Sequence, residues 1–398
     1  MTMNRPAPAD RRIDNTNKQN QKASGKKKET SFFRRFILFL LVAALGLGIL
    51  TGSLYYLDQK GDLSFLQDRF SSGNSSKKKT GSYFKKNKDS SRDGEEENDE
   101  NSTGGYLLAK GSGDGDLSGY TIILDPGHGG RDTGCCYPFN NPDYYECEFN
   151  LRIANEIKDE LVDRGATVYL LRTDNSWISL YNRLAQVHLI CLDIAEEEGK
   201  LPFSSSRADE LRDLLQVCID VNEDTVASGG MGIMVGSGVG EDLEDLMEME
   251  YKLDNVLFLS VHMNSSESMS LHGTQIYYVT DDSIIESEHR QMSTNSEFQR
   301  SDFPLRDDYY GRNNEDNYLL ACCLYDNIVG NLPELETNGH PTNEDNYAVL
   351  REHGLTGALI EVAFLTDSDD RNLLLSDSNV SVVANSVCDG VEMYYKNK

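Results

Sequence analysis

The chain has 398 residues, of which 38% are hydrophobic and 26% charged, with 66 acidic against 38 basic side chains. This content is enough for one good-sized folded domain with extra segments. Residues 117–398 hold only 18 Lys and Arg against 51 Asp and Glu, so this part would repel nucleic acid, and we expect no nucleic-acid partner.

An uncharged apolar run, Phe36 to Leu57, is 22 residues long and as a helix would cross a bilayer. The 35 residues before it carry ten Lys and Arg against three acids, and this excess places the N-terminus in the cytoplasm. We predict a basic cytoplasmic tail at 1–35, a single-pass transmembrane helix at 36–57 and a body outside the cell membrane. The alternative is a secreted protein with a cleaved signal peptide, but the run is long for one and no clear cleavage site follows.

Residues 58–116 are rich in Ser, Gly, Lys and Glu and contain few large apolar side chains. Such a segment buries too little surface to offset its ordering entropy. We therefore predict a disordered linker, with the folded domain at 117–398. The chain also has eight cysteines, and an exported body permits disulfides among them, but the sequence leaves their pairing open.

The folded part begins with YTIIL, from Tyr120, which predicts a strand. Apolar residues at helical spacing follow, Gly165 ends that helix, and ATVYLL predicts a second strand parallel to the first. Further strands are predicted at 256–261, 274–279 and 356–362, and helices near 315–330 and 379–395. The alternation favours an α/β fold, a three-layer sheet flanked by helices on both faces.

A segment at about 185–255 interrupts this alternation. It has helical character on both sides of a glycine-rich break at 228–240. The break lacks the Gly-Lys-Ser/Thr ending of a nucleotide-binding loop. We predict a helical insertion, and our hypothesis is that its acidic helix, 241–254, gates the cleft. A structural appendage or the docking site of a regulatory partner is the alternative.

Three predicted strands end in groups that could carry chemistry. His128 lies in the turn sequence DPGHGG, His262 directly follows an apolar strand, and Glu361 is a carboxylate among apolar neighbours. Loops after buried strands are where α/β proteins place functional side chains. Because catalytic zinc sites use three protein ligands from His and Glu, two histidines need a third, and Glu146 at the start of the first helix can supply it.

Several segments in the same order resemble one known family: ILDPGHGGRDTG, ECEFNLRIA, LLRTDNSWISLYNRL, LSVHMNSS, HGTQIYY, YAVLREHG and ALIEVAFLTD. From Tyr120 to the C-terminus the chain resembles the zinc-dependent N-acetylmuramoyl-L-alanine amidases of bacterial cell-wall hydrolases and phage lysins, the type 3 amidase catalytic domain. The resemblance implies hydrolysis of the amide between N-acetylmuramic acid and L-alanine in peptidoglycan by a zinc-activated water.

The resemblance also implies roles for the site residues. His128, Glu146 and His262 match the ligands of one catalytic zinc ion, and Glu361 matches the catalytic carboxylate. Glu148 is a rival for the metal glutamate, but the spacing to the following Asn-Leu favours Glu146. A nearby acid, Asp125, is expected either to orient His128 or to cap the turn.

Two alternative functions stay open. A zinc peptidase acting on the stem peptide or cross-link would use the same metal chemistry, although no HExxH signature is present. An inactive wall-binding or regulatory module is the other alternative, and the retention of all four site residues argues against it.

Overall fold

A computed structural model describes residues 105–222, 241–268, 270–294 and 314–398. The predicted basic tail 1–35, the predicted transmembrane helix 36–57, the linker up to residue 104 and the glycine-rich break 228–240 lie outside these residues. Among the helices that are described, none combines the length and the apolar character needed to span a membrane.

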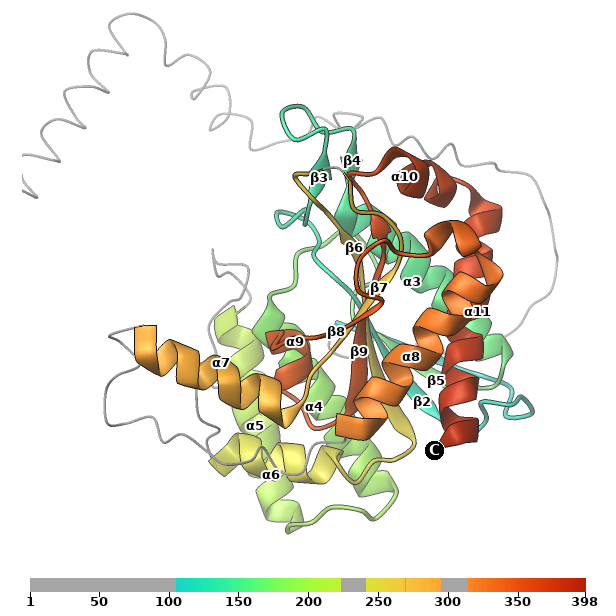
Figure 1. Ribbon diagram of the computed structural model, residues 1–398. Helices are drawn as coiled ribbons and strands as arrows, with labels where there is room; N and C mark the ends of the chain where they lie inside the picture. The colour runs from blue at the N-terminus through green and yellow to red at the C-terminus, as the bar shows by residue number, and fades with distance from the viewer. Residues whose placement is uncertain (1–104, 223–240, 269, 295–313) are drawn as a thin grey trace, which may run out of the picture. The chain divides into compact units, whose positions relative to one another are not determined.

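The described residues form a seven-stranded sheet in the order β1-β5-β2-β6-β9-β7-β8 (Figure 1). Its strands are β1 (Leu107–Lys110), β2 (Thr121–Pro126), β5 (Thr167–Leu170), β6 (Val256–Asn264), β7 (Gln275–Tyr278), β8 (Thr342–Glu344) and β9 (Thr356–Phe364). A separate two-stranded ribbon pairs β3 (Cys136–Tyr137) with β4 (Tyr144–Tyr145).

Helices connect most of these strands. They are α3 (Glu146–Asp163), α4 (Leu180–Glu197), α5 (Ser205–Asn222), α6 (Glu241–Glu250), α7 (Asp281–Thr294), α8 (Asn314–Asn331), α9 (Ala348–Arg351), α10 (Ser368–Leu374) and α11 (Asp377–Asn397), with a 3-10 turn at Pro333–Leu335. Each strand and helix predicted between Tyr120 and the C-terminus has a counterpart among them.

The four central strands of the sheet run parallel to one another, and the strands that flank them run in the opposite direction. β5, β2, β6 and β9 run parallel to one another, which confirms the strand, helix, strand interpretation for β2 and β5. β7 pairs antiparallel with β9, and β1 pairs antiparallel with β5. The carboxyl ends of β2, β6 and β9 therefore meet at one edge of the sheet.

β1 corrects the predicted linker, because Leu107–Lys110 is a strand within residues 58–116. Leu107 pairs with Leu170 and Lys110 with Thr167 at the margin of the sheet. The four residues LLAK are too few to show the alternation of a strand in the sequence. They are ordered because their backbone pairs with that of β5. The folded part thus begins before residue 117.

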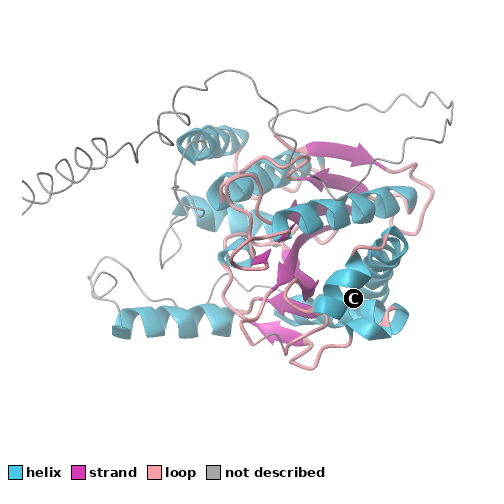
Figure 2. Cartoon of the chain, turned by 90° about the horizontal axis from the view of Figure 1, so that it is seen from above, coloured by secondary structure: helices cyan, strands magenta, loops and turns pink. Residues whose placement is uncertain are grey.

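Side chains on the two faces of the sheet belong to different cores. In β2, Ile122 and Leu124 pack in the cluster formed with α3, α8 and α11, whereas Ile123 packs in the cluster formed with α4, α5 and α6. Figure 2 shows the strands with helices on either side. The sheet flanked by helices is therefore confirmed.

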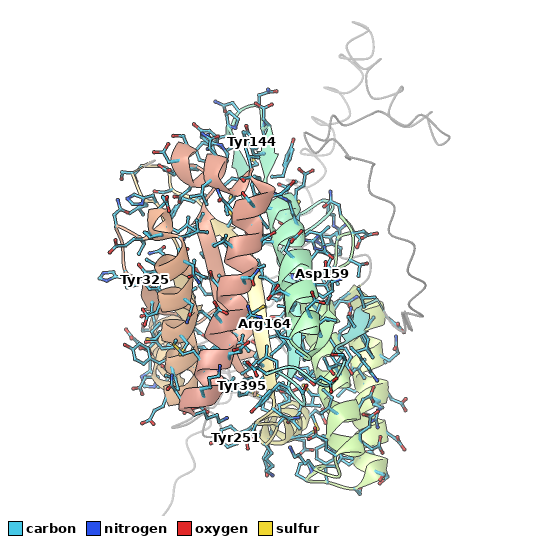
Figure 3. All side chains as sticks on the ribbon, turned by 90° about the vertical axis from the view of Figure 1, so that its right-hand side faces the viewer. Tyr144, Asp159, Arg164, Tyr251, Tyr325 and Tyr395 are labelled. Carbon is cyan, nitrogen blue, oxygen red and sulfur yellow. The ribbon has the colours of Figure 1, made fainter. Side chains whose placement is uncertain are left out.

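The α3, α8 and α11 layer faces the viewer in Figure 3. Arg164, which follows α3, joins it to α11 through Nη1, 2.7 Å from Asp389 Oδ1 and 2.9 Å from Glu392 Oε1. Gly165 has φ +95°, a conformation that favours glycine, and it ends α3 as predicted.

The insertion is helical as predicted, but its acidic helix does not gate the cleft. α6 precedes β6, whose first residue Val256 pairs with Thr121 at the amino end of the parallel strands. Glu250 fixes α6 there, because its Oε1 lies 2.5 Å from His188 Nδ1 and its Oε2 accepts a 2.8 Å bond from the Gly354 amide. The gating hypothesis is therefore wrong for the described helix.

All eight cysteines lie in the described part of the chain, and none of them forms a disulfide there.

Candidate metal centre

Three of the predicted site residues meet at the carboxyl ends of the parallel strands. His128 follows β2, His262 lies on β6, and Glu146 is the first residue of α3. Glu146 Oε1 lies 3.2 Å from His128 Nε2 and 2.8 Å from His262 Nδ1. One ligand atom from each of the three lies within 4.8 Å of the others. The rival Glu148 is exposed on α3 and takes no part in this cluster.

Glycines make room for the cluster. A Cβ on Gly127 would lie 2.1 Å from His262 Cε1, and a Cβ on Gly134 would lie 2.4 Å from Glu146 Oε2. His128 itself has φ +64°, a left-handed conformation that is uncommon for a residue with a side chain and that clusters at functional sites. The absence of a side chain at Gly127 and Gly134 therefore leaves the space that His262 and Glu146 occupy.

Arg172 fastens the loop that carries His128. This arginine is fully buried, and its guanidinium donates to the carbonyl oxygens of Pro126 at 3.1 Å, Gly127 at 3.0 Å and Cys147 at 3.1 Å. It thereby ties the end of β2 to the first turn of α3. Sequence reasoning missed it, although a charged residue directly after the apolar strand TVYLL was a visible signal.

Glu146 is held by hydrogen bonds as well as by the histidines. Its Oε2 accepts a 2.7 Å bond from the Cys135 amide, and its Oε1 accepts 3.3 Å bonds from the Met263 amide and Asn150 Nδ2. Burial acts to raise the pKa of Glu146, but the hydrogen bonds and charges of the two histidines outweigh it and hold that pKa well below its usual range. The carboxylate is therefore ionised and fixed in direction.

The residue that orients His128 is Asp132, which corrects the alternatives given for Asp125. Asp132 Oδ1 lies 3.0 Å from His128 Nδ1, leaving Nε2 directed at Glu146. Asp125 instead lies 2.5 and 2.6 Å from Arg183 Nη1 and accepts a 2.9 Å bond from the Ser260 hydroxyl.

Burial and these neighbours set the pKa values around His128. Burial acts to lower the pKa of His128, but hydrogen bonds to Asp132 and Glu146 raise it to about 9. Burial acts to raise the pKa of Asp125, yet Arg183 outweighs it and the net shift is downward. Sequence reasoning missed Arg183, which lies 58 residues from its partner.

Glu361 lies on β9 opposite His262 in the register of β6 and β9. Its Oε2 atom is buried and has no hydrogen-bond partner among the described residues. Burial, and then the charge of Glu146, raise the pKa of Glu361 well above its ordinary value. Such a carboxyl holds a proton near neutral pH more readily than an exposed one.

These residues line one pocket of about 550 Å³. His128, Glu146, His262 and Glu361 share it with neighbours on both sides of the sheet edge, namely Asp132, Cys135, Leu180, Arg183, Met263, Asn264, Ser265, Tyr347, Ala348, Val349 and Leu359. Two imidazoles and one carboxylate facing a solvent-accessible space are a donor set for a divalent cation with open coordination positions, and Glu361 lies where it can exchange a proton with a group bound there.

A family model described as N-acetylmuramoyl-L-alanine amidase matches the chain over residues 122–195 and 192–393. The chain is also similar to the "Probable cell wall amidase LytH" of Staphylococcus aureus, with 45% identity over 69 residues. That match covers 17% of this chain and spans only 23% of the length of the relative.

Solved structures of low sequence identity are also similar to the chain. The N-acetylmuramoyl-L-alanine amidase AmiC2 of Nostoc punctiforme shares 17% identity, with 70% of this chain and 97% of that chain covered and a TM-score of 0.40. The CwlD amidase of Clostridioides difficile, solved in complex with the GerS lipoprotein, shares 19% identity, with 70% and 100% covered and a TM-score of 0.41.

Proposed function

Because the chain belongs to the N-acetylmuramoyl-L-alanine amidase family, whose model matches it from residue 122 to residue 393, we propose that it hydrolyses the amide bond between N-acetylmuramic acid and L-alanine in peptidoglycan. The observation that carries this proposal is the convergence of His128, Glu146 and His262 beside Glu361 in one pocket. The four residues come from four separate segments of the chain.

We propose zinc as the metal and His128, Glu146 and His262 as its ligands. Two observations support the fit: the three donor atoms lie within 4.8 Å of one another, and the donor types are those of catalytic zinc sites. Bound zinc supplies a Lewis acid that polarises a carbonyl and makes water acidic near neutral pH.

Residues around the ligands hold their donor atoms in place. Asp132 accepts the Nδ1 proton of His128 and so keeps Nε2 free to bind a metal. The Cys135 amide fixes the carboxylate of Glu146 from the other side. These contacts limit the rearrangement that metal binding requires.

We assign Glu361 as the catalytic carboxylate. As the oxygen of the attacking water bonds to the carbonyl carbon, the water loses one proton to Glu361. The buried Oε2 of Glu361 has no competing partner in the part of the chain that the structure describes. Glu361 then returns this proton to the nitrogen of L-alanine as the amide bond breaks, so that the amine departs neutral. The raised pKa of this carboxyl favours the second step.

The location of the enzyme is part of the proposal. We propose that the basic tail 1–35 and the apolar run 36–57 anchor the chain in the cell membrane, with the catalytic domain on the outer side where peptidoglycan lies. Secretion after cleavage is the alternative. A regulatory partner at the insertion stays a prediction.

The test is to incubate the full-length protein with purified peptidoglycan and zinc, and to identify the new chain ends. Free N-terminal L-alanine supports the proposal, whereas new ends within the stem peptide or cross-link indicate a peptidase. Glu361→Gln is the matched control, because it keeps the shape and the three ligands while removing the base. Absence of any new ends with the zinc-loaded wild-type protein would contradict the proposed activity.

A further inference from the structure

Arg131 is an exposed arginine in a turn beside the metal centre. The Gly129 amide donates to the Asp132 carbonyl oxygen at 2.7 Å, and the Asp132 amide donates back to the Gly129 carbonyl oxygen at 3.1 Å. His128, which directly precedes this turn, and Asp132, its last residue, both line the pocket. Arg131 is therefore held at the rim of the pocket, next to the groups that line it.

The ring of Trp177 fixes the guanidinium of Arg131. The Arg131 Cζ atom lies 3.7 Å from the centroid of the ring, so one face of the planar guanidinium is covered. Trp177 packs against the same turn, because a Cβ on Gly130 would lie 2.7 Å from the Trp177 amide nitrogen. The Gly130 amide also donates to Asn175 Oδ1 at 3.0 Å. A ligand of this guanidinium would therefore have little side-chain freedom to remove.

The N–H groups at the edge of this guanidinium are free to bind a ligand. Within the described ranges, the side chain of Arg131 forms no hydrogen bond and no ion pair. The other arginines around the pocket are already bonded to oxygen atoms of the chain: Arg172 to three backbone carbonyls, and Arg183 and Arg351 each to a carboxylate. Arg131 differs from them in having its donors directed at solvent.

The ligand that fits these donors is a carboxylate, because the fork of N–H groups on a guanidinium matches its two oxygens. The domain carries far more acidic than basic side chains, so an anionic group of a substrate is repelled unless a cation lies nearby. In the proposed substrate the amine side continues as a peptide. A carboxylate on its second residue lies two residues from the scissile nitrogen, roughly 7 Å away. It cannot avoid the charges around the pocket.

We propose that Arg131, held by Trp177, binds a free carboxylate on the second residue of the stem peptide. The enzyme then hydrolyses a stem that carries this carboxylate faster than one in which it is a carboxamide. This inference rests on the amidase function proposed above. It assigns Arg131 and Trp177 to substrate selection, separate from the residues that bind metal or transfer a proton.

The experiment measures kcat/KM of the full-length, zinc-loaded protein on two N-acetylmuramoyl-L-alanyl-D-glutamate γ-amides. They differ only at the α-carboxyl group, which is free in one and a carboxamide in the other. We expect the wild-type protein to prefer the free carboxylate by about fivefold, the range of an exposed ion pair of good geometry. Arg131→Gln should bring this ratio to about one. Arg131→Lys keeps the charge but loses the fork, so its ratio should fall between the two.

Lys110→Gln is the matched control. Lys110 is an exposed cation on β1, at the margin of the sheet, and it does not line the pocket. Its loss changes the net charge of the domain as much as Arg131→Gln does. The ratio should therefore stay at about fivefold in Lys110→Gln if the position of the charge matters and not its sum.

Binding at Arg131 can also be observed directly, because Trp177 is the single tryptophan of the chain. In the Glu361→Gln protein, titration with the carboxylate conjugate should change the fluorescence of Trp177. The Kd should be about fivefold lower than for the carboxamide. Adding Arg131→Gln should remove this difference in Kd.

A ratio of two substrates within one variant does not depend on the fraction of protein that is folded or loaded with zinc. A ratio of one in the wild-type protein, an unchanged ratio in Arg131→Gln, or an equal change in Lys110→Gln would overturn the inference while leaving the amidase function intact. Hydrolysis of neither conjugate by the wild-type protein would overturn the proposed function itself.

Discussion

Protonation of His128 should oppose metal binding and stabilise the metal-free protein. The pKa of His128 rises from 6.5 to about 9, because the contacts with Asp132 and Glu146 outweigh the effect of burial. A group whose pKa is raised on folding adds stability in full below its unfolded pKa, and this stability is lost as the pH rises through the folded pKa. The window for His128 is therefore pH 6.5 to 9.

The magnitude follows from the size of the shift. A difference of one pKa unit corresponds to about 1.4 kcal/mol, so the shift of His128 corresponds to about 3 kcal/mol of unfolding free energy in the metal-free state. Urea unfolding of the metal-free full-length protein at pH 6 and pH 9.5 measures the loss. The same two measurements are made on His128→Gln. Subtracting the loss in this variant from the loss in the wild-type protein removes the contributions of the other titratable groups.

We expect the wild-type protein to lose about 3 kcal/mol more than His128→Gln across this window. His289→Gln is the control for the loss of an exposed histidine, because His289 lies on α7 outside the site. Zinc should reverse the trend, since its ligands must be deprotonated. Calorimetry in two buffers should count at least one proton released at pH 7, the proton of His128. Equal pH dependence in the wild-type protein and His128→Gln would refute this account.

Three further predictions follow from the site. Glu361→Gln should lower kcat by about a hundredfold or more. Zinc uptake, measured by metal analysis of the purified protein, should stay at one ion per chain. Loss of zinc together with activity would contradict the assigned role. Arg172→Met should lower the unfolding free energy in urea by about 3 kcal/mol, because three buried carbonyl oxygens each lose a charged hydrogen bond, although Gly127 keeps a bond from Asn150 Nδ2. A change under about 1 kcal/mol would show that water replaces the guanidinium. Treatment with a chelator should abolish hydrolysis of peptidoglycan, and zinc should restore it, whereas persistence of activity without metal would exclude the proposed ligands.

The parts of the fold that could be predicted are those whose signals are local. Strands β2, β6 and β9 are apolar runs that stop at turn or polar residues, so the sequence marks both their existence and their functional ends. Glu146 was identifiable because it opens a helix of clear period. β1 and β8 were missed, because runs of four and three residues show no period and pairing at the sheet margin decides them.

The contacts that could not be predicted depend on distant segments or on one backbone angle. Both Asp125 and Asp132 are within four residues of His128, and sequence spacing does not choose between them. The choice comes from the left-handed conformation of His128, which turns its ring toward Asp132. A second cause is Arg183 on α4, 58 residues along the chain, which forms an ion pair with Asp125.

The charges around the pocket explain why a proton and a metal ion should compete there. Asp132, Glu146 and Glu361 all line the pocket of a domain that is already strongly acidic. Arg183 also lines the pocket, but its charge is already paired with that of Asp125. The three carboxyl groups of the pocket therefore outnumber the cationic side chains that could balance them. In the metal-free protein this deficit is reduced by protons, one on His128 between two carboxylates and one favoured on Glu361. A divalent cation held by His128, Glu146 and His262, as proposed, would supply the same positive charge. It would displace the proton of His128 and lower the pKa of Glu361 toward the range in which a carboxylate can accept a proton from water.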